Sequence, residues 1–308
     1  MSTVWPELPY PAWRDTQATL QLWTQIVGKI RLTQTPWLNH SWHVALYVTA
    51  RGLTTSPIPH GDRSFEIEFD FLAQQLIINV TDGSSRRLTL QPKTVADFYT
   101  EVMTALQELN VPVEISEHPC EIPGAIRFTE DRTHEAYDAG SARRFWQALV
   151  QIDRVFKQFR TGFVGKASPV HFFWGSFDLA VTRFSGRRAP AFTGKVPGLD
   201  TQVMVEAYSH EVSSAGFWPG GGGIDYAAFY SYAYPTPADF KNQPVQHGAF
   251  NETLGEFLLP YDDVRKASNP DALLLEFLQS TYEAAADTAN WDRNELECML
   301  GRPKAVRT

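Results

Sequence analysis

The segment FEIEFDF, which begins at Phe65, alternates cleanly between large apolar and acidic residues. In an extended chain successive side chains point to opposite faces, so the apolar residues share one face and the acidic residues share the other. A strand with one apolar and one charged face favours an antiparallel sheet that buries one side and leaves the other in water. The segments QQLIINV and RRLTLQP, on either side of the turn at Asp82-Gly83, predict that this strand continues into an antiparallel meander.

Amphipathic helices are predicted around the strands. Asp15 has the side chain of an N-cap residue, and Thr94 with Asp97 three residues later resembles a capping box. A long helix is expected from about Ser141 to Arg160, because its large apolar residues recur at helical spacing. Pro270 directly after an asparagine predicts the start of another helix, since proline is favoured in the first turn. Strands and helices that follow one another in blocks indicate the α+β class.

The order of helix, strands and helix occurs twice along the chain. We predict an N-terminal α+β half over residues 1–115, a connector over 116–139, and a C-terminal α+β half over 140–308 that carries an aromatic and glycine-rich insertion. Each half is expected to form a mainly antiparallel sheet with flanking amphipathic helices. An internal duplication would explain this order, and the alternative is that two unrelated modules share a common pattern.

Composition and charge exclude several classes of function. The formal net charge of −8 disfavours a nucleic-acid partner, which would require a positive surface. We expect no membrane partner, because no apolar run approaches the roughly 18 residues that a spanning helix needs. The two cysteines, Cys120 and Cys298, provide neither a disulfide framework nor a four-ligand zinc site. These features are typical of a soluble cytoplasmic protein, and they leave its oligomeric state open.

Polar and aromatic residues gather in the stretch 168–186 and again in 206–223. If the strand alternation continued unbroken through Gly175, His171 and Arg183 would share one face and Trp174 and Asp178 the other. Charged groups within apolar strands are suited to acid–base chemistry or to holding a ligand, although they also form purely structural pairs. The candidate ligand-binding residues are His171, Trp174, Asp178, Arg183, His210 and Glu211.

The chain lacks the motifs of several enzyme classes, so no cofactor or catalytic residue can be assigned. Its serines are outside any GxSxG elbow, and the glycine run of WPGGGGID is followed by no Lys-Ser/Thr pair. That run predicts a mobile turn or a lid over a pocket. Tyr230, Tyr232 and Tyr234 alternate on one strand face, where they could form a pocket wall or pack against the last helix. No metal is expected, and a histidine site made of His43, His171 and His210 would need neighbouring strands.

Long segments of the chain resemble a family of bacterial proteins known only as a domain of unknown function. The segments that carry the resemblance are WPELPY, LWTQIVGK, NHSWHVALYVTARGLTTSPIPHG, SPVHFFWGSFDLAVTRFSGRRAP, EAYSHEVSSAGFWPGGG and LQSTYEAAAD. The resemblance extends over about residues 4–295 and implies a bacterial origin. It implies no activity, cofactor or catalytic residue.

Three hypotheses about function follow from the sequence. The first is a small-molecule enzyme or binding protein with an aromatic and polar cleft mainly in the second half. The second is a non-catalytic interaction or assembly protein, in which exposed Trp and Tyr side chains contact another protein. The third is a metal-dependent enzyme that uses histidines.

Overall fold

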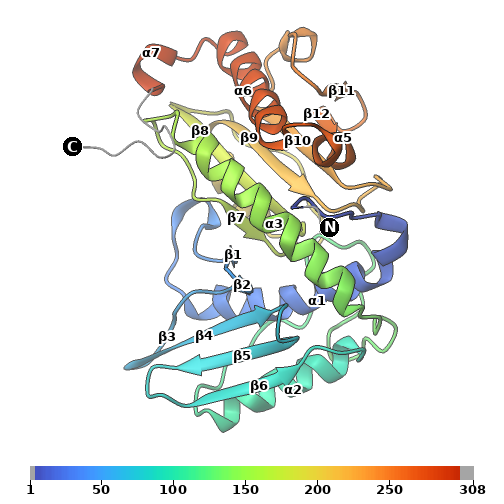
Figure 1. Cartoon of the computed structure of the whole chain (residues 1–308). Helices are drawn as coiled ribbons and strands as arrows, with labels where there is room; N and C mark the ends of the chain where they lie inside the picture. The colour runs from blue at the N-terminus through green and yellow to red at the C-terminus, as the bar shows by residue number, and fades with distance from the viewer. Residues whose placement is uncertain (1–3, 299–308) are drawn as a thin grey trace, which may run out of the picture.

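The computed structural model describes residues 4–298 and shows two antiparallel sheets of six strands each, with helices packed around them (Figure 1). The α+β class predicted from the alternation and the helical spacing is confirmed. The first sheet lies entirely before residue 90 and the second lies after residue 170.

The first sheet has the strand order β1-β2-β4-β5-β6, and β3 pairs with β4 beside this path. Its central strand, β4, contains the alternating segment, and the apolar residues Phe65, Ile67 and Phe69 are buried as predicted. The acidic residues Glu66 and Glu68 on the other face are only half-buried. The strands are β1 Tyr47–Val48, β2 Gly52–Thr54, β3 Ile58–His60, β4 Arg63–Asp70, β5 Gln75–Val80 and β6 Ser85–Thr89.

The second sheet has the strand order β11-β12-β10-β9-β8-β7. Strands β7 to β10 form a meander in chain order, whereas β12 rather than β11 pairs with β10. In a simple meander β11 would pair with β10 and β12 would form the edge of the sheet, whereas here β11 forms that edge. The strands are β7 His171–Phe173, β8 Asp178–Arg188, β9 His210–Trp218, β10 Ala228–Tyr234, β11 Ala249–Asn251 and β12 Glu256–Pro260.

Two long helices, α3 and α6, pack on one face of the second sheet (Figure 1). The predicted helix from about Ser141 is α3, whose N-cap Asp138 accepts a hydrogen bond from the backbone of Ser141. The predicted start at Pro270 is also confirmed, with Asn269 as the N-cap of α6. The α-helices are α1 Tyr10–Gln34, α2 Val95–Glu108, α3 Ala139–Arg160, α4 Thr201–Ala207, α5 Tyr261–Lys266, α6 Pro270–Thr288 and α7 Arg293–Leu296, and the 3-10 turns are η1 Asn39–Ser41 and η2 Phe240–Asn242.

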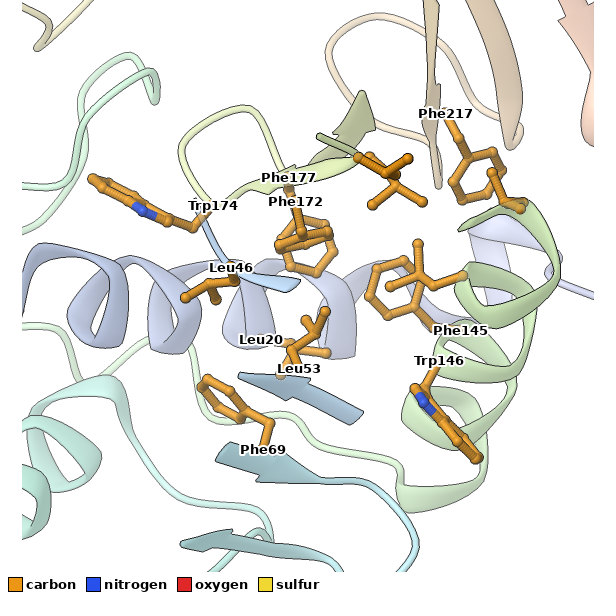
Figure 2. Close-up of a cluster of buried hydrophobic side chains, with 14 of the residues drawn as sticks. Leu20, Leu46, Leu53, Phe69, Phe145, Trp146, Phe172, Trp174, Phe177 and Phe217 are labelled. Carbon is orange, nitrogen blue, oxygen red and sulfur yellow. The ribbon is translucent and has the colours of Figure 1, made fainter. Parts of the chain in front are cut away.

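The two sheets share a hydrophobic core and are joined by backbone hydrogen bonds. Helix α1 runs between them and contacts both α2 and α3 (Figure 1). Leu46, next to β1, exchanges two hydrogen bonds of 2.9 Å each with Phe172 of β7. Figure 2 shows Phe172 and Phe177 packed over the same cluster as Leu20 of α1 and Phe69 of β4. The predicted boundaries at 115 and 140 and the predicted duplication stay predictions.

One local prediction near the N-terminus is wrong, and the chain that follows the first helix is mostly irregular. The first helix begins at Tyr10 rather than after Asp15, because Pro11 lies in the first turn, where no backbone N–H needs an acceptor. The segment after Pro36 forms a strand only at Tyr47–Val48. Before it, His40 and Ser41 have φ angles of 60° and 55°, which interrupt an extended chain.

Candidate functional site

A cavity of about 380 Å³ lies on the face of the second sheet opposite α3 and α6. Neighbouring residues of β8 show the two faces. The guanidinium of Arg183 lies against Phe159 of α3, whereas the side chain of Thr182 lines the cavity. The volume is within the range of pockets that bind small organic molecules, about 300 to 1,000 Å³.

The floor of the cavity contains a polar row that crosses neighbouring strands. Thr182 of β8 pairs with Ser214 of β9, and Ser214 pairs with Tyr232 of β10. Directly paired residues point their side chains to the same face. The hydroxyls of Thr182 and Ser214 are therefore only 2.8 Å apart, and Tyr232 accepts a hydrogen bond of 3.0 Å from Tyr208. Glu256, the first residue of β12, extends this row to a fourth strand.

Asp178, the first residue of β8, is the most deeply buried carboxyl group in the cavity. It accepts hydrogen bonds from the hydroxyls of Ser176 and Tyr230. Burial raises the pKa of Asp178 to about 6, although these two hydrogen bonds oppose the shift. The carboxyl group therefore changes its protonation close to neutral pH.

Gly216 allows Tyr230 to reach Asp178. The tyrosine ring lies directly over the backbone of Gly216, where an added Cβ would be 2.2 Å from the ring. The partners of Gly216 on either side are Ala180 and Tyr230 itself. The alanine and the glycine, which are paired on neighbouring strands, thus leave the space in the cavity floor that the tyrosine ring crosses.

Glu121 brings a second carboxyl group into the cavity from the segment between α2 and α3. Its backbone has a φ of 61°, an uncommon conformation for a residue other than glycine. Its carboxylate lies so close to Gly175 that an added Cβ there would be 2.0 Å from Oε1. His40 and Ser41, which also line the cavity, have positive φ angles as well. Such conformations cost free energy and often occur at functional sites.

The three carboxyl groups of the cavity influence one another. Burial raises the pKa of Glu121 to about 7, and the nearby charge of Asp178 contributes to the shift. The same two causes raise the pKa of Glu256 to about 7. Within residues 4–298, the carboxylate of Glu121 makes no hydrogen bond, and Oε2 of Glu256 is buried without a partner.

The short helix α4 and the residue after it cover the cavity. Val203, Met204 and Ala207 of α4 face it, and Tyr208 follows. The helix is held in place by Glu206, whose carboxylate accepts a hydrogen bond of 2.8 Å from the backbone N–H of His40 and one of 3.3 Å from Trp37 Nε1. Residues that precede the first sheet therefore fix the cover over a cavity whose floor is the second sheet.

A second cavity of about 450 Å³ adjoins the first. The two have Glu121, Gly175, Ser176 and Trp218 in common. The glycine-rich turn, for which a lid was one prediction, forms part of the wall of the second cavity.

The residues proposed from the sequence lie in different places. Trp174 and Asp178 both line the first cavity, and Trp174 Nε1 donates a hydrogen bond of 2.8 Å to the backbone of Val44. Glu211 pairs with Arg187 at 2.7 Å, outside the cavity lining. His210 is also outside the lining, with its ring 6.2 Å from that of His40.

His171 and Arg183 are both buried and are not part of the cavity lining. The ring of His171 is 1% exposed among Trp42, Tyr47 and Phe173, and burial lowers its pKa to about 3. Arg183 is also 1% exposed, and burial lowers its pKa to about 10.

The prediction that His171 and Arg183 share one face of the sheet is wrong. His171 pairs with Ala180, which lines the cavity, so His171 is on that face and Arg183 is on the other. The turn at residues 174–177 breaks the alternation, and Phe177 there has a φ of 59°.

Over the described part of the chain, no three His, Cys, Asp or Glu side chains are arranged to hold a metal ion. His43, His171 and His210 do not converge. The Nδ1 atom of His43 instead accepts a hydrogen bond of 3.1 Å from the backbone of Leu38.

Sequence reasoning missed Glu121, Tyr208, Trp218 and Glu256 as residues of the site. The alternation of Tyr230, Tyr232 and Tyr234 predicted a possible pocket wall, and the first two of them line the cavity. Tyr208 and Trp218 lie in the polar and aromatic stretch 206–223, which the sequence marked without singling out either residue. Glu121 lies in an irregular segment, and Glu256 begins a short apolar strand. Neither position is marked by a motif.

The fold and the cavity define an α+β protein with a small-molecule-sized pocket on one of its two antiparallel sheets. The chain belongs to the family described as "Family of unknown function (DUF5996)", which it matches over residues 5–298. Neither a curated protein nor a solved structure matches it. No helix within residues 4–298 is long and apolar enough to cross a membrane.

Proposed function

We propose that this protein binds a small organic molecule in the first cavity. The observation that carries the proposal is a cavity of about 380 Å³ in which aromatic walls surround the three carboxyl groups of Glu121, Asp178 and Glu256. Apolar walls with a few convergent polar groups are typical of ligand pockets. Carboxyl groups with a pKa of about 6 to 7 also suit proton transfer to a bound substrate, so the proposal includes an enzyme.

Filling the cavity tests this proposal. Ala207→Trp places a large ring into the cavity from α4, whereas Gln202→Trp adds the same ring at an exposed position of that helix. We expect ligand-observed NMR with a fragment library to find binders of the wild type and of Gln202→Trp, and these fragments to lose binding to Ala207→Trp. The proposal fails if no fragment binds the wild type, or if the binders retain their affinity for Ala207→Trp.

A protein contact is a second candidate function. Leu32, Trp37 and Leu38 are 41%, 68% and 48% exposed and lie close together in the sequence. Exposed aromatic and aliphatic side chains are frequent at protein interfaces. If two copies of this chain associate through these residues, light scattering of the purified protein will show a dimer that Trp37→Ser converts to a monomer. A wild-type protein that is monomeric at micromolar concentration would contradict this candidate.

The source and the compartment are also proposals. We infer a cytoplasmic location in a bacterium from the sequence resemblance and from the two cysteines, which are both free within the described residues.

A further inference from the structure

The first cavity is lined by more acidic than basic side chains. Its lining includes three carboxyl groups and one imidazole, that of His40, and no Lys or Arg is found among the described residues that form it. Two amines contact residues of the lining without being part of it. Lys29 Nζ lies 5.9 Å from the ring centroid of Trp174, and Lys166 Nζ lies 2.7 Å from His40 Nε2. The groups that face a ligand therefore have an excess of acid.

Two of these carboxyl groups have no hydrogen-bond donor among the residues that the structure describes. Asp178 is satisfied by two hydroxyls, but Glu121 and Oε2 of Glu256 have no hydrogen-bond partner within residues 4–298. Oε2 of Glu256 is a buried polar atom without a partner, which is uncommon in proteins because an unmade hydrogen bond costs about 1 to 3 kcal/mol. A ligand that donates hydrogen bonds would satisfy both groups.

Aromatic rings surround the same space. Trp218 and Tyr230 have ring centroids 4.4 Å apart, and Tyr230 is followed by Tyr232 at 6.1 Å and an interplanar angle of 18°. Tyr208 closes the row with its centroid 6.3 Å from that of Tyr232. The face of an aromatic ring attracts a cation, and Trp and Tyr do so most strongly.

We propose that the cavity binds an organic cation, such as an amine or a quaternary ammonium, whose charge lies between the carboxylates of Glu121 and Glu256 and against the rings of Tyr208, Tyr230, Tyr232 and Trp218. This inference rests on the proposed function, because it names the class of ligand for the same cavity. A neutral sugar could also use the rings and hydroxyls, but it would leave the excess of acid uncompensated.

The pH dependence of binding separates a cation from a ligand that accepts hydrogen bonds. Glu121 interacts electrostatically with Asp178, Cys120 and Tyr208. Glu256 interacts in the same way with Asp178, Tyr208, Tyr230 and Tyr232. A cation competes with the protons on these carboxyl groups, so its affinity should rise from about pH 5 to about pH 8. An acceptor would need the protonated acids and should bind more weakly as the pH rises.

Matched probes that differ only in charge provide the test. Benzylamine is compared with benzyl alcohol and benzoate, and choline with its uncharged carbon isostere, by isothermal titration calorimetry or by NMR titration. We expect each cation to bind at least about tenfold more tightly than its neutral partner, and benzoate to show no binding. The double variant Glu121→Gln/Glu256→Gln should lose this preference, whereas Glu252→Gln, at an exposed glutamate paired with Lys241, should retain it.

Several outcomes would show that the ligand is not a cation and would still be consistent with a ligand pocket. They are equal affinity for the neutral probes, an unchanged preference in the double Gln variant, and affinity for the cations that falls with rising pH. Binding of benzoate in preference to benzylamine would do the same. If none of the probes binds, and if Ala207→Trp also abolishes the binding of no fragment, both the proposed cation and the proposed function are wrong.

Discussion

At the scale of single residues, Glu121 and Glu256 are largely enclosed, and no donor within residues 4–298 bonds to their carboxylates. Their pKa values of about 7 are the physical consequence, because a buried carboxylate loses its hydration and also experiences the charge of Asp178. Few acidic side chains titrate so close to neutral pH unless a site requires it. The two residues should therefore affect both ligand binding and stability.

These pKa values predict that the two glutamates lower stability as the pH rises. Between about pH 4.5 and about pH 7 the folded protein holds protons that the unfolded chain releases, so the favourable contribution is lost as the pH passes through the folded pKa. Relative to Glu121→Gln/Glu256→Gln, the wild type should lose free energy of unfolding, on the order of 1 kcal/mol or more, from pH 5 to pH 8. Urea unfolding at both values measures this difference.

The comparison with the double variant cancels the effect of other acids, such as Asp82 and Asp97, whose lowered pKa values act at more acidic pH. Glu252→Gln serves as the control and should follow the wild type at both pH values, since its side chain is 73% exposed. An identical difference between wild type and double variant at pH 5 and pH 8 would show that the carboxyl groups titrate normally.

At the scale of elements, the cover of the cavity depends on a contact between the two halves. Helix α4 buries none of its residues fully, so the packing of its own side chains contributes little to its position. The hydrogen bonds from His40 and Trp37 to Glu206 hold it instead. A cover of this kind can open locally at a small cost in free energy.

Replacing Glu206 by alanine should loosen α4 without unfolding the protein. The variant removes the acceptor of two hydrogen bonds, each worth about 1 kcal/mol or somewhat more, and leaves the sheet beneath intact. We expect amide hydrogen exchange over residues 201–207 to become roughly tenfold faster, while exchange in β9 stays unchanged. Gln202→Ala, on the same helix but exposed, is the matched control. Equal exchange in Glu206→Ala and the control would mean that other contacts hold α4.

At the scale of the whole molecule, the sequence predicted local features well. Alternation identified β4, and helical spacing with capping residues identified α3 and α6, because these patterns depend only on neighbouring residues and on burial. The pairing of β12 with β10 was not predictable, since nothing in either strand specifies its partner. That pairing places Glu256 in the polar row.

The candidate site was predictable only in part for the same reason. Trp174 and Asp178 belong to one polar and aromatic stretch, so the sequence alone marked them. Glu121 reaches the cavity through a backbone turn with positive φ and through the close approach to Gly175, which lies far along the chain. Contacts between segments that are distant in the sequence determine where such side chains lie, and a single sequence contains no signal for those contacts.

The walls of the cavity come from separate parts of the gene. Codons for His40 and Val44 precede those for α2, the codon for Glu121 lies between those for α2 and α3, and those for Asp178 and Glu256 follow α3. A recombination event that exchanged either half would join walls that had not changed together. A chimaera that takes one half from another member of the family would therefore have a cavity with walls from two different proteins.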